Sequence, residues 1–210
     1  MAMHTSSPIL DVTEYYLPLD LSEVFGSPKE LALEVGFGDG GFITEMARRK
    51  EDWNFIGIEI KRKRLIKAAK RAERENLQNV KLLLMDAKIA LEEIFTPLAF
   101  STVYINFPDP WPKDRHKKHR IINPGFLEVL SRVLKNEALV EIASDHQEYI
   151  SHIIETFEKT KLFRNEFPLP GYRSAMPNRP MTKYEIEFKA EGREIYYLRF
   201  MKIGKNLQRR

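Results

Sequence analysis

The stretch Leu31–Phe42, LALEVGFGDGGF, decides the fold that the rest of the chain must complete. Its apolar half predicts a buried strand, and Gly36, Gly38, Gly40 and Gly41 predict a tight turn into a helix that starts near Phe42. Glycine suits this turn because it adopts left-handed backbone conformations and lets the chain come close to a ligand. The amides of the turn and of the helix start favour a polar or anionic group. The stretch therefore predicts a nucleotide-type cradle.

Three acids end or interrupt successive apolar runs. Glu59 follows the second run at the spacing of a ribose-binding carboxylate, and Asp86 ends the third. Glu34 lies inside the first strand, where burial is costly unless the carboxylate meets a cation or donor. The glycine pattern alone fits a dinucleotide enzyme or an S-adenosylmethionine (AdoMet) enzyme, but the ammonium and sulfonium of AdoMet suit Glu34 better than a pyrophosphate. Each acid taken alone could instead be a helix cap or a solvated loop carboxylate.

The composition bounds the class of protein. The 210 residues suit one domain, and the lack of Cys excludes disulfides, thiolate metal sites and cysteine nucleophiles. The five His show no ligand spacing, so we predict no metal. There is no apolar run of membrane-span length and no signal-peptide pattern, so we predict a cytoplasmic protein without a membrane partner. The net charge of +4 is concentrated in residues 61–74, 113–120 and 202–210, which favours a polyanionic partner.

Strand-like and helix-like segments alternate along most of the chain. We predict strands at 31–37, 54–60, 80–86, 102–107 and 137–144, and helices at 41–50, 61–76, 87–95, 123–135 and 146–160. This order predicts an α/β fold with a mostly parallel sheet and helices on both faces. Two final strands, at 183–189 and 195–203, are predicted to form a C-terminal antiparallel hairpin, which completes a seven-stranded sheet. Because AdoMet methyltransferases have such a hairpin and nucleotide dehydrogenases generally lack it, the expected fold is of the Rossmann-like class I AdoMet-dependent methyltransferase type.

The same pattern divides the chain into three parts. Residues 1–30 form a short lead-in with about one helical turn, packed by Tyr15, Tyr16 and Phe25; 31–203 form the methyltransferase domain; 204–210 form a basic tail. In the helix predicted at 61–76, an apolar stripe alternates with many Lys and Arg residues. That basic face is either simply solvated or contributes to RNA docking.

A proline-rich loop follows the fourth strand. Asn106–Lys113, NFPDPWPK, holds one carboxylate, Asp109, and one aromatic ring, Trp111, in a chain stiffened by three prolines. Such a loop suits a flat heterocycle that stacks and donates N–H groups, and the basic run behind it suits phosphates. Alternatively, Trp111 plugs the core and Asp109 caps a helix.

The motifs LEVGFGDGGF, GIEI, PDPWPK-x-RHKKHR, ASDH and TKYE, in this order, resemble those of the bacterial-type tRNA (guanine-N7-)-methyltransferases from about Leu31 to Phe200. The resemblance implies methyl transfer from AdoMet to N7 of the variable-loop guanine at position 46 of tRNA. By resemblance, the catalytic residue is Asp109, which also contacts the cofactor, and the other cofactor-binding residues are Glu34, Gly36, Gly38, Glu59 and Asp86. Substrate binding is implied for Lys113, Asp145, Thr182, Lys183, Tyr184 and Glu185, and RNA binding for Arg115, His116, Lys117, Lys118, His119 and Arg120.

Two features depart from the family pattern: the lead-in is short and lacks a basic stretch, and His119 stands where Arg is common. Both affect how tRNA docks rather than the chemistry. The oligomeric state is left as monomer or homodimer. Rival interpretations are a methyltransferase of a small molecule or protein, a dinucleotide-dependent oxidoreductase, and a catalytically silent RNA-binding module.

Overall fold

The structure is a computed structural model that describes residues 7–204. A 3-10 turn, η1 (Val12–Glu14), and a short helix, α1 (Leu21–Phe25), precede the sheet. The strands are β1 (Glu30–Val35), β2 (Trp53–Glu59), β3 (Val80–Leu84), β4 (Phe100–Asn106), β5 (Leu134–Ser144), β6 (Phe163–Asn165) and β7 (Tyr196–Lys202). The remaining helices are α2 (Gly41–Arg49), α3 (Arg62–Arg74), α4 (Ala87–Glu93), η2 (Asp114–His119), α5 (Pro124–Val133), α6 (Gln147–Thr160) and α7 (Lys183–Ala190).

The strands form one sheet in the order β3-β2-β1-β4-β5-β7-β6. The pairs from β3 to β5 are parallel, whereas β7 is antiparallel to both β5 and β6. The strand order reverses direction between β1 and β4, so the carboxyl ends of these two strands flank a crevice where ligands bind in such folds. The predicted fold class, with its antiparallel C-terminal end, is confirmed.

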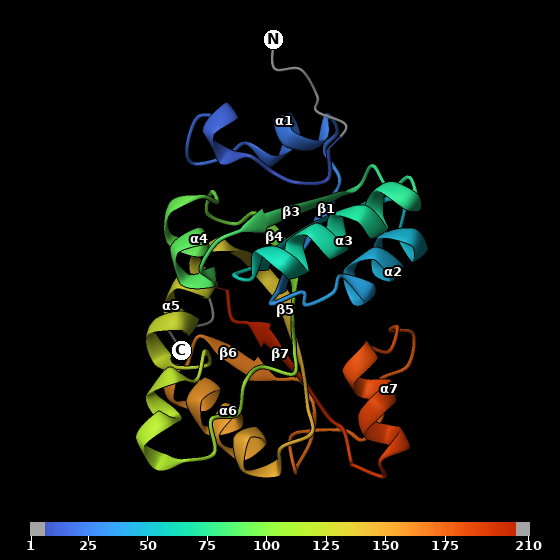
Figure 1. The fold of residues 1–210 in the computed structure, drawn as a ribbon. Helices are drawn as coiled ribbons and strands as arrows, with labels where there is room; N and C mark the ends of the chain where they lie inside the picture. The colour runs from blue at the N-terminus through green and yellow to red at the C-terminus, as the bar shows by residue number, and fades with distance from the viewer. Residues whose placement is uncertain (1–6, 205–210) are drawn as a thin grey trace.

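Helices cover both faces of the sheet (Figure 1). The larger apolar core joins one face to α4, α5 and α6, with Leu19 and Leu21 of the lead-in packed into it. A second core joins the other face to α2 and α3. Farther along this second face, α7 packs through Phe188 on Tyr197 of β7. On this second face, α2 and α3 therefore lie on one side of the strand ends, and α7 lies on the other side.

Two local predictions are wrong. Residues Lys183–Lys189 do not form a strand but belong to helix α7, and β7 pairs instead with the short strand β6. Thr182 explains the helix, because its hydroxyl accepts the Glu185 N–H at 3.0 Å and so caps the first turn. In the lead-in, Tyr15 and Phe25 pack against the core as predicted, but Tyr16 is 95% exposed. Of the predicted basic tail, residues 205–210 lie outside the described part of the chain.

Gly40 is the glycine of the loop with the least room. Its φ is +78°, and a Cβ placed there would lie 2.4 Å from the Cβ of Ala68 in α3. We expect Gly40→Ala to lower the free energy of unfolding by about 2–4 kcal/mol, from strain plus overpacking. Gly192→Ala is the matched control, because Gly192 has φ +75° but no atom within 4 Å of the added Cβ.

Chemical denaturation of both variants measures the difference. The Gly192 variant should lose only about 1–2 kcal/mol, the backbone contribution. Equal losses in the two variants would show that contact with Ala68 contributes nothing.

Candidate functional site

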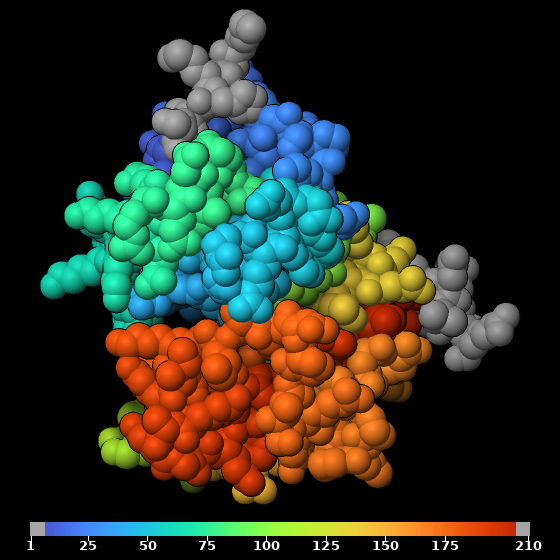
Figure 2. Space-filling view, turned by 90° about the vertical axis from the view of Figure 1, so that its right-hand side faces the viewer, coloured from blue at the N-terminus to red at the C-terminus, as the bar shows by residue number. Residues whose placement is uncertain are grey.

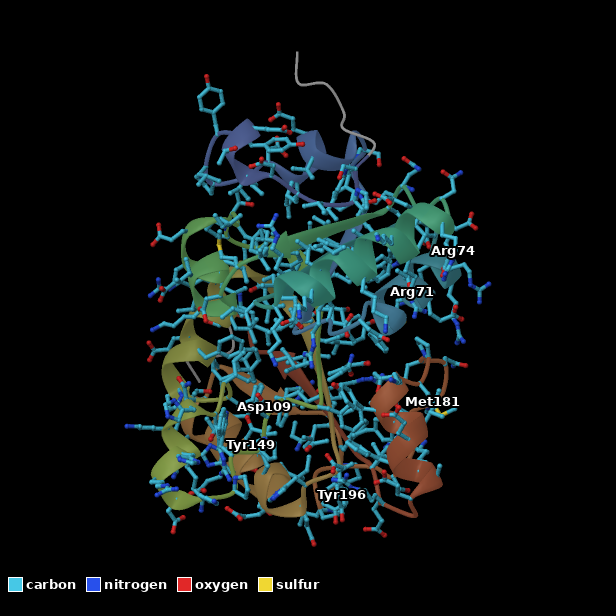
Figure 3. All side chains as sticks on the ribbon, viewed as in Figure 1. Arg71, Arg74, Asp109, Tyr149, Met181 and Tyr196 are labelled. Atoms are coloured by element: carbon cyan, nitrogen blue, oxygen red, sulfur yellow. The ribbon has the colours of Figure 1, made fainter. Side chains whose placement is uncertain are left out.

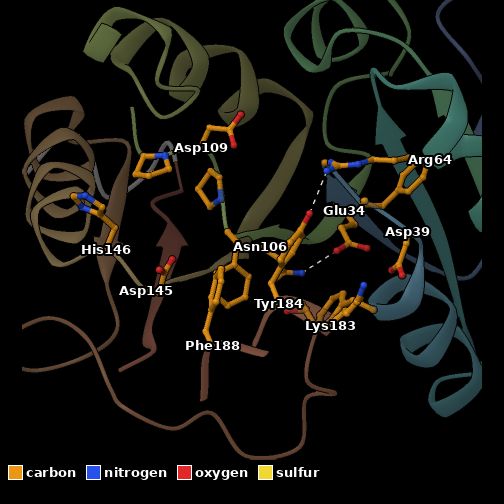
Figure 4. A pocket seen from close by; sticks show the side chains of 18 of the residues that line it. Glu34, Asp39, Arg64, Asn106, Asp109, Asp145, His146, Lys183, Tyr184 and Phe188 are labelled. Atoms are coloured by element: carbon orange, nitrogen blue, oxygen red, sulfur yellow. Dashed lines mark hydrogen bonds between the residues drawn. The ribbon is translucent and has the colours of Figure 1, made fainter. Parts of the chain in front are cut away.

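Two adjoining cavities open where β1, β2 and β4 end, and Figure 4 shows residues that line the larger one. The smaller, of about 240 Å³, is lined by Glu59 and Asp86 on one side and by the proline-rich loop on the other. The larger, of about 600 Å³, extends from the glycine loop to α7. Asp109 lines both cavities, as do Asn106 and Arg64. The structure therefore brings the predicted loop acid and the strand-end acids to one place.

The glycine loop and Glu59 hold each other. The Glu59 carboxylate is buried and accepts the Gly38 N–H at 3.1 Å and the N–H groups of Ile60 and Lys61 at 2.9 and 3.0 Å. A Cβ at Gly36 or Gly38 would meet no protein atom within 4 Å. Both glycines line the larger cavity, so a ligand can approach their backbone closely.

Asp86 caps a helix, which is the alternative role that the sequence analysis left open for it. Its carboxylate accepts the N–H groups of Lys88 and Ile89 at 2.9 and 3.2 Å and caps α4. It also lines the smaller cavity beside Glu59. Both of these hydrogen bonds go to Oδ1, and Oδ2 accepts none from the residues that the structure describes.

Glu34 is buried beneath the larger cavity with one oxygen committed. Its Oε1 accepts the amide of Asn106 at 2.9 Å (Figure 4), whereas Oε2 is buried without a hydrogen-bond partner in the described part of the chain. Burial raises the pKa of Glu34 to about 7, opposed by the Asn106 hydrogen bond and by the charge of Arg179. The site thus contains an acid with a free acceptor that a cationic donor would stabilise.

The raised pKa of Glu34 predicts a pH-dependent stability. Because the folded protein holds this proton up to about pH 7 while the unfolded chain loses it near 4.5, stability falls as pH rises between these values. The loss from this group amounts to about 3 kcal/mol and levels off above pH 7. Urea denaturation of the wild type and of Glu34→Gln at pH 5 and pH 8 isolates it. Relative to the wild type, the free energy of unfolding of the variant should be higher at pH 8 than at pH 5. If the two proteins lost stability equally between pH 5 and pH 8, Glu34 would not be the cause.

Arg179 was not among the residues identified from the sequence. Its side chain is 6% exposed and donates to Asn106 Oδ1 and, at 3.3 Å, to Glu185. The guanidinium also lies against the rings of Phe42 and Tyr197, with centroid distances of 4.9 and 5.2 Å. Arg179 therefore connects the loop before α7 to the amide that holds Glu34. Arg179 lies alone among the irregular residues before α7, so no local sequence pattern indicated this role.

The predicted substrate residues near α7 divide into two groups. Lys183 and Tyr184 line the larger cavity, and the Tyr184 hydroxyl accepts a hydrogen bond from Arg64 of α3 at 3.2 Å. Thr182 also lines it, but its hydroxyl caps α7. Glu185 lies underneath, 2% exposed, bonded to Arg179, Lys189 and the Tyr197 hydroxyl. Its carboxylate supports the wall of the cavity from behind.

Asp145 lies across the larger cavity from the glycine loop (Figure 4). It pairs with Arg193, whose guanidinium lies 3.9 Å from the centre of the Phe188 ring. Phe107, Tyr184 and Phe188 all line this cavity and pack on one another, with ring centroids 5.5 to 6.3 Å apart. The cavity therefore offers both a carboxylate and aromatic surface.

The loop that carries Asp109 is held in a strained conformation. Phe107 and Trp111, on either side of Asp109, have φ values of +50° and +40°, which ordinary residues adopt at a cost of about 1–3 kcal/mol each. Arg120 stabilises the loop by donating to the Pro110 carbonyl at 2.8 Å and to Glu148 at 3.3 Å. Trp111 is not a core plug, since it is 36% exposed and packs on His116 and His119.

The basic run behind this loop is only partly available to a polyanion. Arg120, with a side chain 2% exposed, is buried under the loop. Lys117 pairs with Asp114 and Glu148, each at 2.9 Å. Lys113 and Lys118 are exposed, as is Arg115. Trp111 and His119 instead line the smaller cavity. The structure therefore places the run beside the site but commits two of its cations to structural contacts.

The residues present fit AdoMet. The buried, unpartnered oxygen of Glu34 suits an ammonium group, and the open backbone at Gly36 and Gly38 suits close approach of a ligand. Glu59 and Asp86 share the smaller cavity, where carboxylates suit ribose hydroxyls and adenine N–H groups. Within residues 7–204, His, Asp and Glu form no cluster of three or more that would hold a metal ion. Over the same residues, every helix is too short or too polar to span a membrane.

A family model described as a putative methyltransferase matches residues 28–198. A Thermotoga maritima protein named tRNA (guanine-N(7)-)-methyltransferase is 37% identical over 91% of this chain, and a Syntrophotalea carbinolica protein of the same name is 34% identical over 86%. The chain belongs to the tRNA (guanine-N7-)-methyltransferase family. It spans 63% of the length of the Thermotoga relative and 78% of the Syntrophotalea relative.

Solved structures support the fold independently of this family. The antibiotic-resistance methyltransferase Kmr is similar with a TM-score of 0.63, covering 90% of this chain and 94% of its own at 16% identity. At that identity the likeness establishes the fold alone. Family membership therefore rests on the sequence matches, and the structural likeness adds only that the fold is shared.

Proposed function

We propose that this chain transfers the methyl group of AdoMet to N7 of a guanine in tRNA, forming 7-methylguanosine. The observation that carries the proposal is the pair of adjoining cavities that share Asp109. One holds the carboxylates of Glu59 and Asp86, and the other joins Glu34 to an aromatic wall and a rim of cations. The activity in the names of the Thermotoga and Syntrophotalea relatives agrees with it.

Different residues of the site bind the two ends of AdoMet. Glu34 receives the ammonium group, Glu59 the ribose hydroxyls, and Asp86 the adenine side, while Gly36 and Gly38 let the backbone approach. AdoMet, when bound, supplies a methyl group made electrophilic by its sulfonium. Because only ionised Glu34 attracts an ammonium, and burial raises the pKa of Glu34 to about 7, binding near neutral pH displaces a proton from this carboxyl.

Guanine N7 carries a lone pair in the plane of the ring, so no proton must be removed before it reacts. The residues of this chain therefore contribute alignment and electrostatic stabilisation. Phe107, Tyr184 and Phe188 provide rings against which a base stacks, as single-stranded bases do in RNA-binding proteins. Asp109 accepts hydrogen bonds from guanine N1–H and the amino group, and its charge offsets the positive charge that builds on the ring.

The remaining residues position the substrate around this centre. Asp145 and the Thr182–Glu185 segment contact the guanosine, with Glu185 acting through the wall that it supports. Lys113 and the exposed members of the Arg115–Arg120 segment contact phosphates.

The test is to incubate the purified chain with unmodified tRNA and methyl-labelled AdoMet, digest the RNA to nucleosides and identify the labelled product. We expect labelled 7-methylguanosine. Label in another nucleoside would overturn the assignment of the base. Bound AdoMet without labelled RNA would point to a small molecule or a protein as methyl acceptor.

A further inference from the structure

Helix α3 presents a row of cations that starts at the larger cavity and continues beyond it. Lys63, Lys67, Lys70 and Arg74 follow one another at helical spacings of three or four residues, so they share one face. All four are exposed, and Glu73 is the single acid among residues 62–74. The row is about 16 Å long, at 1.5 Å of rise per residue.

The row begins at the mouth of the larger cavity. Lys63 and Lys67 line this cavity from α3, and Lys183 lines it from α7 on the opposite side. In Figure 2, α2 and α3 (cyan to teal) and the C-terminal segments that include α7 (orange) meet along a seam, with side chains of α3 projecting beside it. Figure 3 places Arg71 and Arg74 at the end of α3 that lies away from Asp109. A polymer that inserts one base between α3 and α7 therefore has the row beside its backbone.

The charges of the row are only partly neutralised within the protein. Lys67 pairs with Asp39 at 3.2 Å, and Arg74 approaches Glu75 at 3.8 Å. Lys63 and Lys70 form no ion pair with any described residue. Exposed ion pairs contribute little, about 0–1 kcal/mol, so these cations have little structural reason to be where they are.

The basic run after the proline-rich loop leaves room for such a surface. Arg120 is buried against Pro110 and Glu148, and Lys117 is shared between two acids. The segment therefore presents fewer free cations than its sequence suggests. A chain of phosphates entering the cavity needs positive charge on more than this one side.

We propose that the row Lys63–Lys67–Lys70–Arg74 on α3 is a second phosphate-binding surface, which holds the RNA backbone next to the base that enters the larger cavity. The inference rests on the proposed function, because it takes RNA as the polyanion. It assigns contacts to phosphates alone, which position a substrate without reading its sequence.

The test compares tRNA affinity over a series of salt concentrations for the wild type and for Lys63→Gln/Lys70→Gln. This pair is chosen because neither lysine forms an ion pair with the described residues. The affinity falls as salt rises, and each lost phosphate contact makes the slope of log K against log salt shallower by about 0.7–0.9. We therefore expect the double variant to have a slope shallower by about 1.5, and weaker binding at every salt concentration. Lys63→Arg/Lys70→Arg should keep the wild-type slope.

The matched control is Lys88→Gln/Lys159→Gln, which removes the same charge from α4 and α6 on the other face of the sheet. It should keep the wild-type slope, and thermal unfolding checks that every variant is folded. If the α3 double variant and the control double variant have equal slopes, the row is not a phosphate-binding surface, while the proposed function stands. If the wild type binds no tRNA at all, the proposed function fails and the row fails with it.

Discussion

Replacing Asp109 with Asn is expected to lower kcat for tRNA methylation by about 10²-fold or more, while the Kd for AdoMet changes far less. The variant keeps the shape of the side chain but removes its charge and puts an NH₂ donor where guanine N1–H and its amino group need acceptors. The loop itself should hold, because Arg120 fixes it through the Pro110 carbonyl rather than through the Asp109 side chain.

Single-turnover methylation and AdoMet titration together measure this separation. Asp114→Asn is the matched control: Asp114 lies in the adjoining basic segment, is 94% exposed and, among residues 7–204, pairs only with Lys117. It should leave kcat within a factor of about two, as for a surface ion pair. An unchanged kcat in the Asp109 variant would remove this carboxylate from the reaction.

Arg179→Gln is expected to lower the free energy of unfolding by about 3 kcal/mol, because it leaves Glu185 buried with one cation fewer. For a domain of this size, that corresponds to a fall in Tm of about 6–12 °C. The variant also releases the Asn106 amide, which holds Glu34, so AdoMet binding should weaken as well if Glu34 receives the ammonium group as proposed.

Arg164→Gln provides the control for a guanidinium paired at the surface. Arg164 is 64% exposed and lies 3.0 Å from Glu166, so its loss should cost about 0–1 kcal/mol. Thermal unfolding and AdoMet calorimetry on both variants make the comparison. If the Arg179 variant were as stable as the Arg164 variant, the buried network would not support the site.

Much of the fold could be predicted because its signals are local. The runs that become β1, β2 and β3 are buried on both faces of a parallel sheet along most of their length, so most of their residues are apolar. The glycines at 36, 38 and 40 adopt left-handed backbone conformations, which their sequence pattern already required.

Alternation misled the prediction at one place. Tyr184, Ile186 and Phe188 alternate as in a strand, yet Ile186 is 54% exposed and the segment is helical. The competing signal was Thr182 with Glu185 three residues later, a capping-box pattern that marks a helix start. Here the cap, and not the alternation, was the better guide.

By itself, the sequence determined the glycine loop, the order of strands and helices from residue 31 to residue 160, and the edge of the sheet at which Glu34, Glu59 and Asp86 lie. Those features follow from hydrophobic pattern and backbone preference, which act over a few residues. Only the tertiary structure decided that Arg179 would hold Asn106, that Arg120 would be buried under the Asp109 loop, and that α3 and α7 would face each other across one cavity. These contacts join residues far apart in the chain, and packing, rather than any local pattern, brings them together.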